Sequence, residues 1–370
     1  CTLAECALMA GVTNNPSLYD PYERPEAARR RQRLVLTKMY DCGFITEDEY
    51  KQALGEEYVL RRRTSVGTVY DYYTDMVIED VINDLMETYG YSYNYAQSLV
   101  FYGGLNIYSA EIRSEQEAVE KIYADESNYP KKISGDAEDP QTGLVIMNYD
   151  GRIAVTIGGR GLKTASRIQN RSTQTTRQPG SAIKPLSVYA LSLQYNLVHY
   201  SSLVRDCYIT LPNGKRWPTN YRASLRDNGD VLLNYAIQDS LNTVPARLLQ
   251  TLTPKNSFDF MTSTLGFSHM YKTYRTEDGR VLTDMDMAPL ALGALTEGVT
   301  VKEMCAGYQI FGNGGVYNEP WSYYSVTRGD ETLLEKKPKS VQAISADSAY
   351  IVNRLLQEVV TGSAGSGRDI

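Results

Sequence analysis

Ser181 and Lys184, three residues apart, are the residues of this sequence whose types and spacing most directly suggest catalysis. Both stand in the segment RQPGSAIKPL, in which Pro179 and Gly180 end a loop and a helix is predicted to follow. Three-residue spacing places the two side chains on one helical face. A serine hydroxyl is a poor nucleophile at neutral pH, but a lysine that loses its proton in an apolar cleft can act as its base. The segment therefore predicts a serine nucleophile at a helix start, where backbone N–H groups face a developing oxyanion.

The Ser-x-x-Lys spacing alone is a weak signal. A single match is what chance gives for 27 serines and 14 lysines among 370 residues, and a single match is found. The hypothesis therefore depends on the flanking loop, on the helix and on a second motif further along the chain.

That second motif is Ser240-Leu241-Asn242, within VLLNYAIQDSLNTVPARLLQ. A serine and an asparagine two residues apart cannot face the same way on an unbroken helix, so a catalytic interpretation requires a helix end here, which Pro245 favours. In that interpretation Ser240 relays a proton between Lys184 and the leaving group, and Asn242 holds a substrate amide. The alternative is a polar helix end, and Ser92-Tyr93-Asn94 shows how easily the pattern arises.

Composition disfavours several other functions. The formal net charge of −6 gives no reason to expect a nucleic-acid partner. The only two histidines, His199 and His269, are too few to suggest a metal site, and no Gly-x-Ser-x-Gly occurs, so we expect no metal, no organic cofactor and no Ser-His-Asp hydrolase. The odd number of cysteines and the lack of Cys-x-x-Cys predict buried thiols rather than disulfides. The cysteines are Cys1, Cys6, Cys42, Cys207 and Cys305.

The elements that must position these motifs change in kind along the chain. The first 58 residues are predicted to be helical, with a helix that begins after Thr46 and has Glu49 in the capping-box position. Apolar periodicity predicts a long helix from about residue 70 to residue 89. A strand at 103–113, a helix at 114–124 and a polar loop at 134–143 follow. Two apolar runs joined by Asp150-Gly151 predict a β-hairpin with a type I′ turn.

Helices dominate after an extended loop at 163–180. They are predicted at 181–195, 231–251, 257–265, 288–296, 300–311 and 347–361, with a short strand pair near 316–327. Hairpin strands followed by a block of helices predict an α+β fold.

Taken together, six segments in order resemble class A, bifunctional penicillin-binding proteins. RQPGSAIKPL resembles their active-serine segment and SLNTVPARLL their Ser-x-Asn segment. GLVIMNYDGRIAVTIGGR resembles the hairpin before the serine, and LALGALTEGVTVKEMCAGYQIFGNGGVYNEP the helices and turn after it. ECALMAGVTNNPSLYDPYERPEAARRRQRLVLTKMYDCGFIT is similar to the end of their glycosyltransferase domain, and GGLNIYSAEIRSEQEAVEKI to their linker.

The resemblance implies an organisation in three parts. Residues 1–58 would be the helical remnant of a glycosyltransferase domain, 59–140 a linker region, and 141–370 an incomplete transpeptidase domain. The implied fold is the penicillin-binding serine-transpeptidase fold, an antiparallel sheet with a helical block.

Two departures from the family pattern indicate a piece of a longer chain, truncated at both ends. No Lys-Thr-Gly or Lys-Ser-Gly follows Ser240, and Lys163-Thr164-Ala165 precedes the nucleophile. The family uses that third element to bind the substrate carboxylate, so we expect weak or absent acylation by this piece alone. The family's catalytic glutamate for glycan polymerisation lies upstream of residue 1, so no glycosyltransferase residue can be named.

As the resemblance implies, the chain belongs to a D,D-transpeptidase that cross-links peptidoglycan stem peptides through an acyl-enzyme on Ser181. The implied partners are stem peptides, lipid II and β-lactams, with possible cell-division or elongation proteins. The implied location is the extracytoplasmic face of a bacterial cell membrane, reached through an N-terminal anchor that is absent here. The alternatives are a D,D-carboxypeptidase or β-lactam hydrolase, in which water resolves the acyl-enzyme, and a catalytically silent scaffold.

Overall fold

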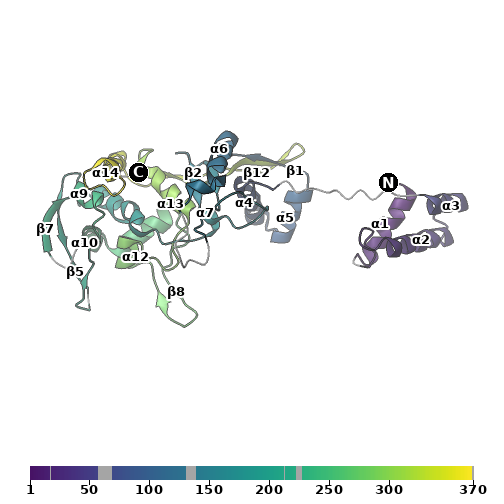
Figure 1. The fold of residues 1–370 in the computed structure, drawn as a ribbon, viewed down its shortest axis with the longest axis horizontal. Helices are drawn as coiled ribbons and strands as arrows, with labels where there is room; N and C mark the ends of the chain where they lie inside the picture. The colour runs from purple at the N-terminus through teal and green to yellow at the C-terminus, as the bar shows by residue number, and fades with distance from the viewer. Residues whose placement is uncertain (17, 57–68, 131–138, 212, 222–226, 369–370) are drawn as a thin grey trace. The chain divides into compact units, whose positions relative to one another are not determined.

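The computed structural model describes residues 1–16, 18–56, 69–130, 139–211, 213–221 and 227–368 (Figure 1). The chain divides into two compact units, Cys1–Thr68 and Val69–Ile370, each with a hydrophobic core of its own. Half of the predicted polar loop at 134–143 lies outside the described residues, as does the start of the predicted linker at 59–68.

The first unit is helical, as predicted. Its helices are α1 (Leu3–Asn14), α2 (Pro25–Asp41) and α3 (Glu47–Gly55). At the start of α3 the Thr46 hydroxyl accepts the Glu49 N–H, and the Glu49 carboxylate accepts the Thr46 N–H, which confirms the predicted capping box. Small side chains at Ala4 and Ala7 allow α1 and α2 to pack closely around the fully buried Leu36.

The second unit begins with α4 (Tyr72–Tyr89), the long helix that apolar periodicity predicts. Its buried stripe faces the core, and it ends at Gly90 in the left-handed conformation that commonly terminates a helix. The next helix, α5 (Tyr93–Tyr102), was not predicted. The Ser92 hydroxyl caps α5 by accepting the Tyr95 N–H, so the first Ser-x-Asn pattern is a helix start.

An antiparallel sheet shares its core with α4. Its strands, in spatial order, are β1 (Leu105–Ser109), β11 (Tyr323–Arg328) and β12 (Glu331–Glu335). The predicted helix after β1 is confirmed as α6 (Arg113–Ala124). Tyr73 of α4 is fully buried, and its hydroxyl donates to the carbonyls of Ile153 at 2.5 Å and Ser322 at 3.0 Å. This one side chain therefore ties α4 to two segments far apart in sequence.

The predicted hairpin is confirmed as β2 (Leu144–Met147) and β3 (Ile153–Ile157), but its turn is not type I′. Type I′ requires positive φ at both central residues. Here only Gly151 has positive φ, at +84°, and its N–H donates to the Asn148 carbonyl, as expected of a three-residue loop ending in a glycine bulge. The Asp150 carboxylate accepts the Arg152 N–H and stabilises this alternative turn. Trp321 joins the hairpin to the segment before β11, because its carbonyl accepts the Ile153 N–H.

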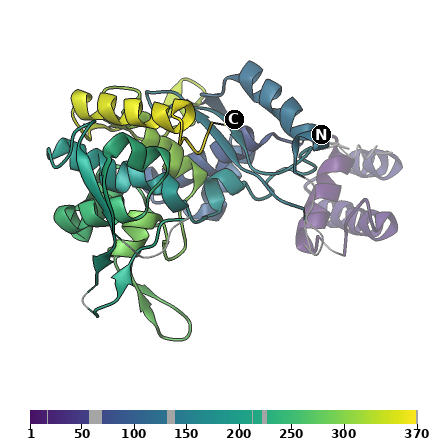
Figure 2. The ribbon, with the colours of Figure 1, turned by 60° about the vertical axis from the view of Figure 1, so that its left-hand side comes forward.

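Helices and short strand pairs form the rest of the second unit (Figures 1 and 2). The helices are α7 (Arg171–Gln174), α8 (Ala190–Gln194), α9 (Leu233–Gln238), α10 (Thr243–Leu252), α11 (Pro254–Asp259), α12 (Met287–Leu292), α13 (Val301–Tyr308) and α14 (Ala346–Thr361). The paired strands are β4 (Leu203–Cys207) with β7 (Asp227–Leu232), β5 (Ile209–Thr210) with β6 (Arg216–Trp217), β8 (Tyr274–Arg275) with β9 (Val281–Leu282), and β10 (Val316–Asn318) with β13 (Ser340–Gln342). The α+β prediction is confirmed.

Two segment predictions need correction. The predicted helix at 231–251 is interrupted between α9 and α10, and its first residues belong to β7. The strands predicted near 316–327 exist but do not pair with each other, because β10 pairs with β13 and β11 with β1 and β12. Strand partners are chosen by the tertiary fold, which neighbouring residues do not reveal.

The prediction of buried thiols is wrong for the first unit. Cys1, Cys6 and Cys42 are exposed, because the small core of that unit is filled by alanine and leucine side chains on other helix faces. Cys207 and Cys305 are partly buried, and all five are free thiols. Among the described helices, none combines the length and apolarity needed to cross a bilayer.

Replacing Tyr73 with phenylalanine should lower the free energy of unfolding by about 1–3 kcal/mol, because the buried Ile153 and Ser322 carbonyls lose the tyrosine hydroxyl, although Ser322 keeps the Ala110 N–H. Denaturant unfolding would measure this. The matched control is Tyr102→Phe, since Tyr102 is 87% exposed, and this change should have almost no effect. Equal effects of the two changes would contradict the linking role of Tyr73.

Candidate active site

Ser181 lies in a tight helical turn rather than at the start of a regular α-helix. Residues Gly180–Ile183 form a 3-10 turn in which the Lys184 N–H donates to the Ser181 carbonyl. Pro185 has no N–H and cannot continue an α-helical ladder, and the next turn, Pro185–Tyr189, has π-helical spacing before α8 begins. A 3-10 turn has three residues per turn, so Ser181 and Lys184 lie on the same face.

The loop before Ser181 is held by backbone contacts and by one amide side chain. Arg177 and Val299 exchange two backbone hydrogen bonds of 2.9 Å. The Gln178 side chain donates to the Leu295 carbonyl and accepts the Leu295 N–H, both at 2.7 Å. These bonds fix the approach to the serine before its helical turn begins.

Two glycines allow the chain to pack directly against this loop. Gly293, which ends α12 with φ of +73°, lies so close that a Cβ there would be 2.2 Å from the Gly180 carbonyl oxygen. A Cβ at Gly298 would be 2.3 Å from the Arg177 carbonyl oxygen. Both positions therefore require glycine, by conformation and by space.

Lys184 is the central group of the site. Its side chain is buried, with the residue only 2% exposed, and its amine donates to the carbonyls of Ser240 at 2.9 Å and Leu241 at 3.0 Å. It also donates to Asn242 Oδ1 at 2.8 Å and lies 3.4 Å from Ser240 Oγ. Burial lowers the pKa of the Lys184 amine to about 8, while the surrounding oxygens favour its protonated form.

The 240–242 segment reaches Lys184 because α9 ends just before it, as the catalytic interpretation requires. The Ser240 N–H donates to the Ile237 carbonyl and the Leu241 N–H to the Ala236 carbonyl, which is the Schellman pattern of a helix end. Ser240 itself has φ of +49°, in a position that usually holds glycine. Strained backbone of this kind is typical of functional sites. Pro245 is not the cause of the interruption, since it lies within the first turn of α10.

The structure brings all four sequence-predicted site residues to one place, three of them in one cavity and the fourth in contact with Lys184. Ser181, Lys184 and Ser240 line one cavity of about 200 Å³, together with residues of α9 and α14. Asn242 contacts Lys184 directly. Ser181 is exposed, and among the described residues its hydroxyl makes no hydrogen bond to the Lys184 amine. The arrangement leaves an accessible serine beside a buried amine whose donors point to the 240–242 segment.

Residues that sequence reasoning missed hold this segment from behind. Asn220 Oδ1 accepts the Asn242 N–H at 2.8 Å, and the Thr219 carbonyl accepts Asn242 Nδ2 at 2.8 Å. Asn220 also receives support from the buried Asp206. No local pattern marks these residues, since 22 positions separate Asn220 from Asn242.

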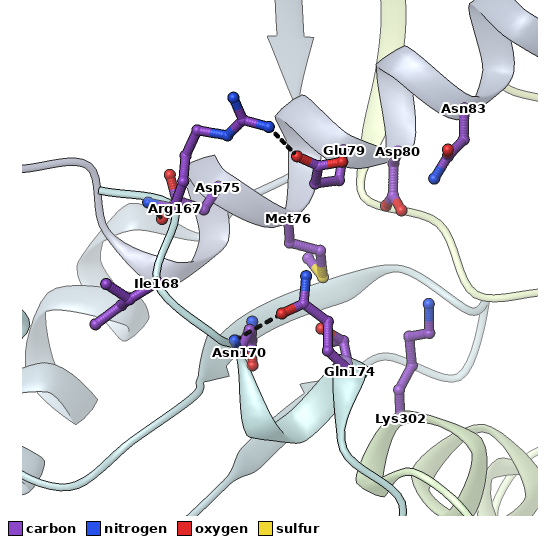
Figure 3. Close-up of a pocket in the computed structure, with 11 residues that line it drawn as sticks. Asp75, Met76, Glu79, Asp80, Asn83, Arg167, Ile168, Asn170, Gln174 and Lys302 are labelled. Atoms are coloured by element: carbon purple, nitrogen blue, oxygen red, sulfur yellow. Dashed lines mark hydrogen bonds and ion pairs between the residues drawn. The ribbon is translucent and has the colours of Figure 1, made fainter. Parts of the chain in front are cut away.

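A larger polar pocket, of about 400 Å³, lies elsewhere, between α4 and residues 167–174 (Figure 3). Glu79 pairs with Arg167 at 2.6 Å, and Asp75 pairs with Lys163. The lysine of the Lys163-Thr164-Ala165 segment is therefore engaged in a buried ion pair. The pocket therefore lies where ion pairs connect α4 to residues 163–167.

The histidines do not form a second candidate site. His269 Nδ1 faces both Glu303, at 2.9 Å, and the Ser268 hydroxyl, at 3.3 Å. A Ser-His-acid triad needs the serine and the acid on opposite ring nitrogens. Within the described residues, no group of three metal-ligating side chains is present.

Comparison with known proteins places this geometry in context. Residues 134–369 match the family model of the penicillin-binding protein transpeptidase domain, and residues 1–40 match the transglycosylase model. Penicillin-binding protein 1A of Clostridium botulinum is 29% identical, over 99% of this chain and 45% of that protein. Penicillin-binding protein 1A of Streptococcus oralis is 26% identical, over 99% of this chain and 55% of that protein. The chain thus spans about half the length of these relatives.

Solved structures share the fold. The crystal structure of penicillin-binding protein 1A from Haemophilus influenzae has a TM-score of 0.65 at 20% identity, and the match covers 98% of this chain and 68% of that chain. The penicillin-binding protein PonA1 from Mycobacterium tuberculosis, in complex with penicillin V, has a TM-score of 0.59 at 19% identity over 80% of this chain and 74% of that chain.

The lowered pKa of Lys184 predicts a specific pH dependence of stability. Between pH 8 and 10.5 the unfolded chain binds more protons at this lysine than the folded chain does, so this contribution to stability rises with pH. The difference in unfolding free energy between the wild type and Lys184→Met should therefore grow in favour of the wild type, by on the order of 3 kcal/mol across that window. Urea unfolding at several pH values measures it, and a difference independent of pH would contradict the desolvated amine.

Proposed function

Because the chain belongs to the class A penicillin-binding proteins, we propose that its second unit carries the acylation site of a serine D,D-transpeptidase, with Ser181 as nucleophile. The observation that carries this proposal is the buried Lys184 amine, held one 3-10 turn from an exposed serine and bonded to the Ser240–Asn242 segment. A lysine in this setting can lose its proton near neutral pH and serve as a base.

In the proposed reaction, Ser181 Oγ attacks the penultimate D-Ala carbonyl of a stem peptide, and its proton passes to the neutral Lys184 amine. The tetrahedral intermediate collapses as the C–N bond to the terminal D-Ala breaks, and Ser240 relays the proton from Lys184 to the leaving nitrogen. Asn242 holds the substrate amide. An amine of a second stem peptide then attacks the acyl-enzyme, its proton returns to Ser181, and a new amide cross-link results. β-Lactams would acylate the same hydroxyl.

The wider role is proposed for the full-length protein. There, residues 1–58 would end a glycosyltransferase domain that polymerises lipid II, 59–140 would be a linker region, and 141–370 would begin the transpeptidase domain. We place the protein at the extracytoplasmic face of the cell membrane, attached through an N-terminal anchor, with cell-division or elongation proteins as candidate partners. The two family matches and the relatives named above support this assignment.

The nucleophile is tested by labelling the full-length protein with a fluorescent penicillin. Wild-type protein should form a covalent adduct, and Ser181→Ala should form none, because the attacking oxygen is lost. Ser366→Ala removes another hydroxyl from the same cavity and should leave labelling intact. An adduct that survives Ser181→Ala would refute the assignment.

The base is tested by the pH dependence of acylation. The rate should rise as Lys184 loses its proton and should level off above pH 8, the region of its lowered pKa. Lys184→Ala should lower the rate by roughly a thousandfold or more, since nucleophile and base act as one unit. Stopped-flow measurement with penicillin would show both effects, and a pH-independent rate would exclude Lys184 as the base.

A further inference from the structure

Behind the 240–242 segment lies a cluster of three buried polar residues, Asp206, Asn220 and Thr243, which are 5%, 8% and 3% exposed. We propose that this cluster positions Asn242, and through it Lys184, for acylation, an inference that rests on the proposed function. The three residues come from β4, from the segment after β6 and from the start of α10. They are positioning residues, because none of them touches the serine or the lysine.

The cluster is joined by short hydrogen bonds that converge on one carboxylate. Asp206 Oδ1 accepts from Asn220 Nδ2 at 2.7 Å and from the Thr243 hydroxyl at 2.6 Å. Asp206 Oδ2 accepts from Asn228 Nδ2 at 2.8 Å. Within the described residues Asp206 forms no ion pair with a lysine or arginine, and the donors named here are two neutral amides and a hydroxyl. Removing one such donor is costly, because a buried charge is left short of a partner.

Asn220 transmits this anchoring to the start of α10. Its Oδ1 accepts the N–H groups of Asn242 at 2.8 Å and of Thr243 at 3.3 Å. These are among the first N–H groups of the helix, which lack partners within it. The Asn242 side chain does not cap α10 itself, so a residue from another segment satisfies this role. The Asp206 carboxylate also lies at the end of α10 where negative charge is favoured.

The consequence for Lys184 follows from the Asn242 amide. Its Nδ2 donates to the Thr219 carbonyl while its Oδ1 accepts from the Lys184 amine, both at 2.8 Å. Asn220 holds the Asn242 backbone, and the Thr219 carbonyl holds the Asn242 Nδ2 group. The side-chain amide therefore presents its acceptor oxygen, Oδ1, to the lysine. The cluster therefore fixes both the place and the orientation of the group that contacts the base. A misplacement of about 1 Å at such a point can cost a hundredfold in rate.

Thr243 offers a matched pair of substitutions for the test, made in the full-length protein. Thr243→Val keeps the shape but loses the hydroxyl bond to Asp206, whereas Thr243→Ser keeps the hydroxyl and loses a methyl group. Two quantities are measured with a saturating fluorescent penicillin: the acylation rate constant and the fraction of chains finally acylated. Thr243→Val should lower the rate constant roughly tenfold with an unchanged final fraction, and Thr243→Ser should restore it to within about twofold of the wild type.

A merely structural role gives a different result. In that case the Thr243→Val molecules that react would do so at the wild-type rate, whatever the loss of melting temperature, and the proposal would be overturned. Asn220→Ala is a second variant, expected to slow acylation at least as much. Asp230→Asn, an exposed carboxylate on the neighbouring strand β7, is the control and should change neither quantity.

Failure of this inference can be told apart from failure of the proposed function. If Ser181→Ala still forms the adduct, the nucleophile is wrong and the positioning cluster has no reaction to serve. If Ser181→Ala is inert but Thr243→Val reacts at the wild-type rate, the transpeptidase assignment stands and only the positioning role is lost.

Discussion

The burial of one lysine amine is the constraint on which the rest of this site depends. An ammonium group removed from water is costly unless oxygens surround it, and a lysine that is too well satisfied would never release its proton. The chain meets both demands by placing Lys184 against two carbonyls and one amide oxygen of the Ser240–Asn242 segment. Burial lowers the pKa of this amine to about 8, and the oxygens around it stabilise the protonated form.

Irregular backbone makes this arrangement possible. A continuous helix through residues 233–252 would direct its carbonyls along its own axis, where none could reach the lysine. Ser240, in the left-handed conformation, ends the helical path after α9. The carbonyls of Ser240 and Leu241 then face the Lys184 amine. On the other side, the 3-10 turn before Pro185 aligns Ser181 with the lysine. Departures from regular helix thus occur on both sides of the same amine.

Local signals in the sequence were sufficient for some of this architecture and not for the rest. The capping box at Thr46, the apolar stripe of α4 and the hairpin of β2 and β3 all follow from neighbouring residues, and the structure confirms them. The need for a helix end near Asn242 could also be deduced, although its cause, the Schellman turn at Ser240, could not. Helix α5 was not predicted, although a serine in the N-cap position, such as Ser92, is a common start of a helix. Asn220 contacts Asn242 across 22 positions of sequence, a separation that no local pattern encodes.

The close contact of Gly293 and Gly298 with the loop before Ser181 has a consequence for how this protein can change during evolution. A side chain cannot be added at either glycine without moving the carbonyl of Gly180 or of Arg177. Substitution of these two glycines is therefore excluded. At Gly180 itself a Cβ would meet open space, so this position requires only a positive φ, which asparagine also tolerates. Natural variants can thus change residue 180, on the solvent side of the loop before Ser181. Positions 293 and 298, which pack behind that loop, can hold only glycine.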